Sequence, residues 1–278
     1  PSKLTYSIDT ISGGLPNLPK LVKVFYSGQT TSTFGDLDKA KYIAQTLGFI
    51  ALPVAPLDGQ AVIGTLNDPS KLLKISTATL NFNLESDFQN NKQVISTRLR
   101  SVEDSTKIAD TFIRAFGLPV NDFTKDKTTT IFYKIDAGKL ADAASLSGAN
   151  LLQVNFGRTS IDKLEVYPIN YLRPNVWLLV SRDNVVLGNK NITNFARHKF
   201  STYPLKGVQK AFEELRAGKG AFNKKFDGNN FTVRDVDLAY LETEKPQGFL
   251  QPVYAFKSDD NFLAFVPAVD PAWTIDQN

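Results

Sequence analysis

The chain has 278 residues, of which 42% are apolar and 22% are charged, and its formal net charge at pH 7 is +4. This composition is typical of a globular protein with one large domain or two ordinary ones, and it excludes a disordered or collagen-like chain. With no cysteine and a single histidine, the chain cannot form disulfides, thiolate nucleophiles, zinc–thiolate or iron–sulfur centres, or multi-histidine metal sites. We therefore expect no metal and no cofactor.

Three amphipathic helices are predicted in chain order, over residues 36–47, 102–116 and 205–217, because apolar residues recur in each at i, i+3 and i+4. Ser101 is the expected N-cap of the second helix, with carboxylates in its first turn. A glycine follows each helix and provides a C-terminal stop: Gly48, Gly117 and Gly218.

Segments rich in β-branched and alternating residues follow every helix and predict strands. They are residues 61–65, 74–83, 93–99, 128–135, 151–156, 163–169, 176–181, 231–242, 248–256 and 262–269. Pro252 predicts an edge or a bulge in the strand that contains it. Any two amphipathic helices resemble each other to some extent, so the helices alone do not establish a repeat. The strands that follow each helix favour a repeated helix-plus-strand unit. We expect an α+β fold of repeated helix plus antiparallel β-meander units in two lobes, with an N-terminal α+β domain over residues 1–100 and a C-terminal α+β domain over residues 101–278.

The C-terminal stretch carries a family resemblance. Its elements are Tyr203-Pro204-Leu205-Lys206, the segments 236–242 and 249–256, and Phe262-Leu263-Ala264-Phe265-Val266-Pro267-Ala268-Val269. Their order resembles the C-terminal modules of the YycH/YycI type of bacterial extracytoplasmic regulatory proteins, and more loosely PepSY-like domains. The resemblance implies one N-terminal membrane helix, a globular part outside the cytoplasm, modulation of a sensor kinase through protein contact, and no catalytic residues.

The composition also bears on the expected location of the protein. The absence of cysteine fits an extracytoplasmic bacterial protein, although cytosolic proteins can also lack it. No apolar run approaches the roughly 18 residues of a membrane-spanning helix. The chain starts at Pro1 and contains no methionine, from which we expect an ectodomain cut from a membrane tether at the outer face of the cell membrane.

Four groups of residues match patterns that occur in catalytic or ligand-binding sites. His198 lies between two cations, yet no partner nucleophile or acid is evident, so a loop histidine is expected. Short acidic pairs more often serve turns and strand faces than a hard cation; these are Asp235 with Asp237 and Asp259 with Asp260. Ser160 and Lys163 match S-x-x-K without its companion motifs. The glycines of Ala217-Gly218-Lys219-Gly220 follow a helix, so they suit a helix end and not a phosphate cradle.

The aromatic residues of the last strands give one candidate interaction face, formed by Phe249, Tyr254, Phe256, Phe262 and Phe265. Most of these side chains should be core, and the sharper interpretation leaves one sheet face open for a partner. We expect a non-enzymatic module that binds a protein partner in the bacterial cell envelope, and no nucleic acid, because the basic residues are scattered. The alternative is a carrier or sensor that holds a small apolar or peptide ligand in a sheet concavity, and an enzyme using His198 is third.

Overall fold

The chain folds into two compact units whose segments interleave along the sequence. The computed structural model describes residues 4–28, 36–50, 60–65, 68–245 and 247–274. Unit 1 comprises Pro1–Gly28, Thr159–Pro174 and Thr193–Asn278, and unit 2 comprises Gln29–Arg158 and Asn175–Ile192. The predicted division at residue 100 differs from this one, because Arg100 lies inside unit 2 and the C-terminal half of the chain contributes to both units.

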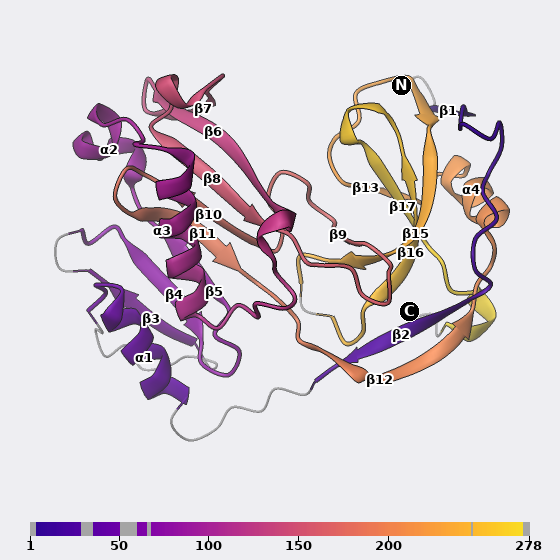
Figure 1. Cartoon of the computed structure of the whole chain (residues 1–278), viewed down its shortest axis with the longest axis horizontal. Coiled ribbons are helices and arrows are strands. Elements are labelled where there is room, and N and C mark those ends of the chain that lie inside the picture. Colours follow the sequence, from indigo (N-terminus) through magenta and orange to yellow (C-terminus); the bar gives the residue numbers. More distant parts are fainter. Residues whose placement is uncertain (1–3, 29–35, 51–59, 66–67, 246, 275–278) are drawn as a thin grey trace. The chain divides into compact units, whose positions relative to one another are not determined.

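Unit 2 contains three helices and, in the described residues, an eight-stranded sheet whose neighbouring strands are all antiparallel. In sheet order the strands are β3 (Gln60–Gly64), β4 (Leu72–Ser76), β5 (Phe82–Glu85), β11 (Val185–Lys190), β10 (Val176–Val180), β8 (Leu151–Phe156), β6 (Thr128–Asp136) and β7 (Lys139–Asp142). The helices are α1 (Asp36–Thr46), α2 (Lys92–Ser96) and α3 (Val102–Ala115) (Figure 1).

The central strands of this sheet are covered on both faces. Every residue of β8 and of β10 is buried, as the uninterrupted apolar run of β10 requires. Leu178 packs in the core that contains Phe112 of α3, whereas the next residue, Leu179, packs in a second core that contains Val94 of α2. Successive residues of a strand point to opposite faces, so α3 and α2 cover opposite sides of the sheet.

Helix α3 is set by its caps and its apolar stripe. Ser101 Oγ accepts a hydrogen bond from the backbone N–H of Asp104 at 2.9 Å, and this cap satisfies one of the free donors of the first turn. Phe112 and Ile113 are buried on its inner side. Gly117 follows with φ +71°, a conformation that glycine adopts without strain.

The described part of unit 1 contains a five-stranded sheet, two smaller strand pairs and one α-helix. The sheet is β13 (Ala221–Phe222), β17 (Leu263–Pro267), β16 (Gln251–Lys257), β15 (Asp235–Glu242) and β9 (Val166–Pro168), in that order. Strand β2 (Leu21–Ser27) pairs with β12 (Phe195–Pro204), and β1 (Thr5–Ile8) pairs in parallel with β14 (Asn230–Val233). Helix α4 (Val208–Arg216) packs on the sheet, with the Phe212 and Phe256 rings 5.9 Å apart.

The predicted α+β class is confirmed, since helices accompany sheets that are mostly antiparallel. The three predicted helices are present as α1, α3 and α4. The last begins only at Val208, because β12 runs to Pro204 and Gly207 adopts φ +88° before the helix. None of the helices in the described ranges has the length and apolar character needed to cross a membrane.

Several strand predictions were wrong in detail. Residues 92–96 form α2 and not a strand, because the Asn91 side chain caps the amides of Gln93 and Val94. The predicted strand 74–83 is a hairpin, with Leu80 at φ +54° in its turn. Pro252 lies near the start of the central strand β16 and not at an edge or a bulge. Proline is tolerated near a strand start because few ladder hydrogen bonds are lost there.

Candidate functional site

The five aromatic residues predicted as an interaction face do not form one exposed surface. Tyr254 and Phe256 are completely buried in the core that α4 covers, and Phe265 is buried in a different cluster on the opposite face of the sheet. Phe262 is partly buried, and Phe249 is 48% exposed. The reason is that β16 is a central strand, so its alternate side chains enter covered layers on both sides.

The other chemical candidates are held in ordinary contacts. His198 is exposed on β12 and forms no hydrogen bond or ion pair with a described residue. Lys257 pairs with both Asp235 and Asp237. Among the described residues no group of three or more His, Asp or Glu side chains could hold a metal ion.

The S-x-x-K match and the glycine-rich segment are also held in structural contacts. The Ser160 hydroxyl donates to Glu165 Oε1 at 2.9 Å, and it forms no hydrogen bond with Lys163. The glycine-rich segment follows α4, and Gly218 there adopts φ +80°, as its predicted role at a helix end requires.

Strand β12 is the longest described strand of unit 1, and none of its residues is buried. Within the described residues its only sheet partner is β2 (Figure 1). The Leu205 amide donates a hydrogen bond to the Lys20 carbonyl, so these two residues are a hydrogen-bonded pair across the strands. In an antiparallel pair such residues alternate along the strand, and the register therefore fixes which backbone groups of β12 point toward β2. The N–H and C=O groups of Phe200 and Thr202 therefore point away from β2.

Exposed aromatic side chains lie along this strand pair. The Tyr26 hydroxyl is 3.1 Å from Ser201 Oγ and 3.2 Å from the Tyr203 hydroxyl, and the hydrogen bonds to these two groups lower the pKa of Tyr26. Tyr26 also forms an isolated bridge with Phe249. On the other face, Lys23 Nζ lies 4.5 Å from the centroid of the Phe200 ring, a favourable cation–π distance.

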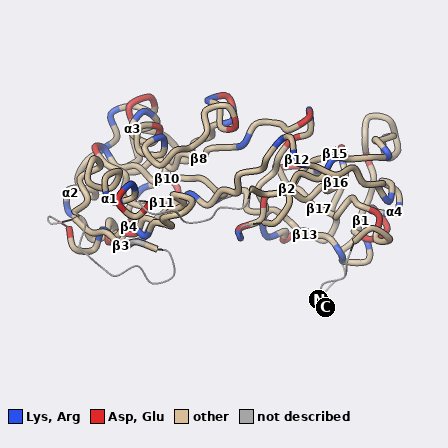
Figure 2. Tube along the Cα trace, turned by 90° about the horizontal axis from the view of Figure 1, so that it is seen from below, with Lys and Arg blue, Asp and Glu red and all other residues tan. Residues whose placement is uncertain are grey.

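Basic side chains adjoin the aromatic ones. The register of β12 shifts between Phe195 and Phe200, so several residues bulge there. The bulge contains exposed Arg197, His198 and Lys199. We call the solvent-accessible groups of Tyr26, Arg197, Lys199, Phe200, Thr202 and Tyr203 the β12 surface. Elsewhere Lys and Arg are spread along both units among Asp and Glu (Figure 2).

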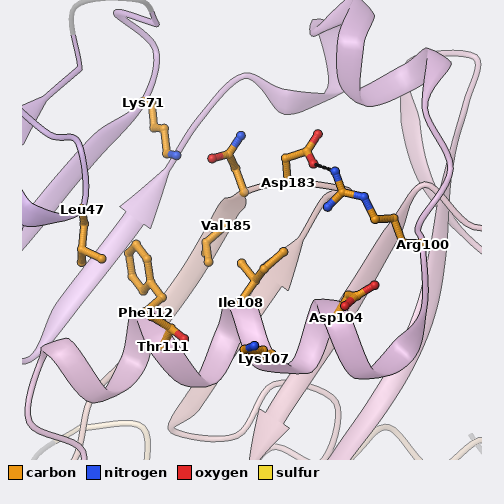
Figure 3. Close-up of a pocket in the computed structure, with 11 residues that line it drawn as sticks. Leu47, Lys71, Arg100, Asp104, Lys107, Ile108, Thr111, Phe112, Asp183 and Val185 are labelled. Atoms are coloured by element: carbon orange, nitrogen blue, oxygen red, sulfur yellow. Dashed lines mark hydrogen bonds and ion pairs between the residues drawn. The ribbon is translucent and has the colours of Figure 1, made fainter.

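Unit 2 holds a separate concave site of about 370 Å³ between α3 and the turn that precedes β11 (Figure 3). Its floor is formed by the apolar side chains of Leu47, Ile108, Phe112 and Val185, and its rim carries Lys71, Arg100, Asp104, Lys107 and Asp183. We call it the α3 hollow. A second hollow of about 410 Å³ adjoins it and shares Leu47, Lys71, Asp183 and Asn184.

Two cations of the rim, Arg100 and Lys71, differ in whether a carboxylate pairs with them. Arg100 forms an ion pair with Asp183 across the hollow (Figure 3). Burial lowers the pKa of Lys71, and the charge of Asp68 opposes this effect. Lys71 Nζ lies 5.3 Å from the centroid of the Phe49 ring and forms no ion pair with a described carboxylate.

Sequence reasoning missed this site because its residues come from four separate segments. Arg100 and Asp183 are 83 positions apart, and no periodic pattern joins them. The only local signal was the short polar turn of residues 181–184 between two apolar runs, which marks a loop and not a site.

The comparisons with known proteins leave the family open. No protein-family model matches the chain, and no curated protein matches it in sequence. An uncharacterised protein from Eubacterium rectale is 11% identical, with a TM-score of 0.40, over 88% of this chain and 82% of that one. The C-terminal domain of YpeB from Bacillus megaterium is 12% identical, with a TM-score of 0.37, over 87% of this chain and 95% of that one. Likenesses this low assign no function, and neither protein carries the YycH/YycI name.

Proposed function

We propose that the chain is a non-enzymatic binding domain that docks an extended, acidic segment of a protein partner on the β12 surface. The observation that carries this proposal is that β12 pairs with β2 alone over Phe200–Tyr203, with aromatic and basic side chains beside the outward backbone groups of Phe200 and Thr202. The end of the strand is covered, since the Pro204 carbonyl accepts from the Asp270 amide. An exposed strand edge is a ready template for a further strand.

Each part of the β12 surface has a role in this docking. The outward backbone groups of Phe200 and Thr202 supply main-chain hydrogen bonds to the incoming segment. The rings of Phe200 and Tyr203, which belong to β12 itself, supply apolar contact area at low cost in side-chain entropy. Arg197 and Lys199 select acidic residues and speed the encounter. The bulge that contains these two cations blocks pairing along the rest of the strand, so only a short segment docks.

The location and the fold family belong to the same proposal. The absence of cysteine and the resemblance of the C-terminal stretch to YycH/YycI-type and PepSY-like modules support a membrane-anchored protein at the outer face of the bacterial cell membrane. The resemblance also supports a repeated helix-plus-meander organisation in two lobes. Regulation of an envelope partner by contact, without catalysis, is the activity that fits these features.

The test uses two synthetic peptides of the same length, one of alternating Glu and Val and one of alternating Lys and Val. We expect the Glu peptide to bind and to slow the amide hydrogen exchange of Phe200 and Thr202, since both amides become hydrogen-bonded. The Lys peptide should bind at least about tenfold more weakly, because it meets like charge. Equal binding of both peptides, or binding without slower exchange at these amides, overturns the proposal.

Charge reversal provides the matched variant. The double substitution Arg197→Glu and Lys199→Glu should exchange the peptide preference, whereas the same reversal at exposed Lys39 and Lys92 of unit 2 should leave it unchanged. Location is tested separately by protease treatment of intact cells. Cleavage of the native protein only after lysis contradicts the extracytoplasmic placement.

The second candidate function, a carrier or sensor of a small ligand, is favoured by one observation, the α3 hollow. It lies between a helix and the sheet, and its floor has one aromatic residue, Phe112, among aliphatic ones.

A further inference from the structure

The α3 hollow combines an apolar floor with a charged rim. Ile108 and Phe112 of α3 lie over Val185 of β11, and Leu47 closes one side (Figure 3). Phe112 and Val185 are almost fully buried, and Leu47 and Ile108 are partly buried. An apolar ligand group placed here would remove further apolar surface from water, at roughly 25 cal/mol per Å².

The charge balance of the rim favours a single negative charge. Asp183 already neutralises Arg100 through their ion pair, and Lys107 and Asp104 are exposed on α3, where solvent screens them. Lys71 is the rim cation that is both desolvated and without an ion pair to a described carboxylate, and the nearby charge of Asp68 offsets only part of that desolvation. A ligand anion at Lys71 restores the electrostatic stabilisation that burial removes.

The same balance disfavours a doubly charged group. Arg100 is already paired with Asp183 and Lys107 is exposed to solvent, so the second charge of a phosphate dianion would find no desolvated and unpaired cation in the rim. Figure 3 shows the Lys71 side chain directed toward the space above the floor. A ligand with one negative charge and one apolar group therefore matches the α3 hollow.

We propose that the α3 hollow binds an organic monocarboxylate with an apolar body, whose carboxylate pairs with Lys71 and whose body lies on Leu47, Ile108 and Phe112. The site is independent of the β12 surface, because all its residues belong to unit 2.

The test compares two probes of nearly equal shape, 4-phenylbutanoate and the neutral 4-phenylbutanamide, added to the full chain at pH 7. Binding is followed by chemical-shift changes of the Ile108 and Val185 methyl groups. We expect saturable binding of the carboxylate that is at least about tenfold tighter than that of the amide. Equal affinity for both probes, or no saturable shift at these methyl groups, overturns the proposal.

Two lysine variants separate the named contact from general electrostatics. Lys71→Met keeps the apolar stem and should abolish the preference for the carboxylate, leaving the two probes equal. Lys107→Met removes an exposed cation of the same rim and should preserve the preference. An unchanged preference in Lys71→Met contradicts the proposal, provided that its amide spectrum matches the native fold. A loss in Lys107→Met as large as that in Lys71→Met also contradicts it.

Discussion

Lys190 Nζ donates a hydrogen bond to the Leu80 carbonyl oxygen at 3.2 Å, so a buried cation of β11 joins the turn between β4 and β5. A second acceptor, Asn81 Oδ1, lies 3.5 Å away. Lys190 is 2% exposed and forms no ion pair with a described carboxylate. Burial lowers its pKa to about 8, because the charged amine loses more hydration than two neutral acceptors replace.

The free energy of unfolding should rise as the pH increases from about 8 toward the ordinary lysine pKa of about 10.4. In this window the unfolded chain binds a proton at Lys190 that the folded chain has released, so raising the pH favours the folded state. The expected gain from this residue is about 2 kcal/mol between pH 8 and pH 10.

The measurement is urea unfolding of the wild type and of Lys190→Met across this pH range. The difference between the two proteins should shift by that amount, because the other titrating groups are common to both. Lys74→Met, at a half-exposed lysine of β4, should track the wild type. A constant difference between wild type and Lys190→Met would show that Lys190 keeps an ordinary pKa.

Asn150→Ala should lower the free energy of unfolding by about 2–3 kcal/mol. The buried Asn150 amide donates to the carbonyls of Ile95 and Thr97, both at 2.9 Å, and its Oδ1 accepts from the Ile135 amide. The substitution leaves these backbone groups without a partner. Hydrogen exchange should also quicken in α2. The exposed Gln93→Ala serves as control and should change stability by less than about 0.5 kcal/mol.

Ser101→Ala should destabilise the protein by about 1 kcal/mol, because the Asp104 amide loses its cap. Ser101→Gly should cost only a few tenths of that. Thr106→Ala, inside the same helix, removes a hydroxyl that bonds only the Val102 carbonyl, and should be neutral or slightly stabilising. Thermal unfolding followed by circular dichroism distinguishes these cases, and equal losses at both sites would contradict capping.

Gly188→Ala should destabilise unit 2 by about 1–3 kcal/mol. A Cβ at this position of β11 would contact the Leu178 side chain too closely and would lie 3.0 Å from the Trp177 carbonyl oxygen. Both neighbours belong to the buried strand β10 and have little room to move. Gly148→Ala meets no atom within 4 Å and should be tolerated. Chemical unfolding of the two variants provides the comparison, and equal stability would argue against close packing at Gly188.

Local patterns were sufficient for α1, α3 and α4. The i, i+3, i+4 spacing and the Ser101 cap predicted α3 almost to its ends, because a helix is stabilised by neighbours within one or two turns. The strand prediction for residues 93–99 failed for an equally local reason, since the Asn91 cap outweighed the β propensity of Val94 and Ile95.

The sequence by itself determined the α+β class, the main helices and the absence of cysteine chemistry, since composition and short-range periodicity carry these properties. Only the tertiary structure decided which strands became central, and thereby buried Tyr254 and Phe256 while Phe249 stayed exposed. It also decided that Arg100 meets Asp183 and that Lys71 loses water beside them. Burial and charge pairing depend on chain segments far apart in sequence, and no local pattern specifies which of them come together.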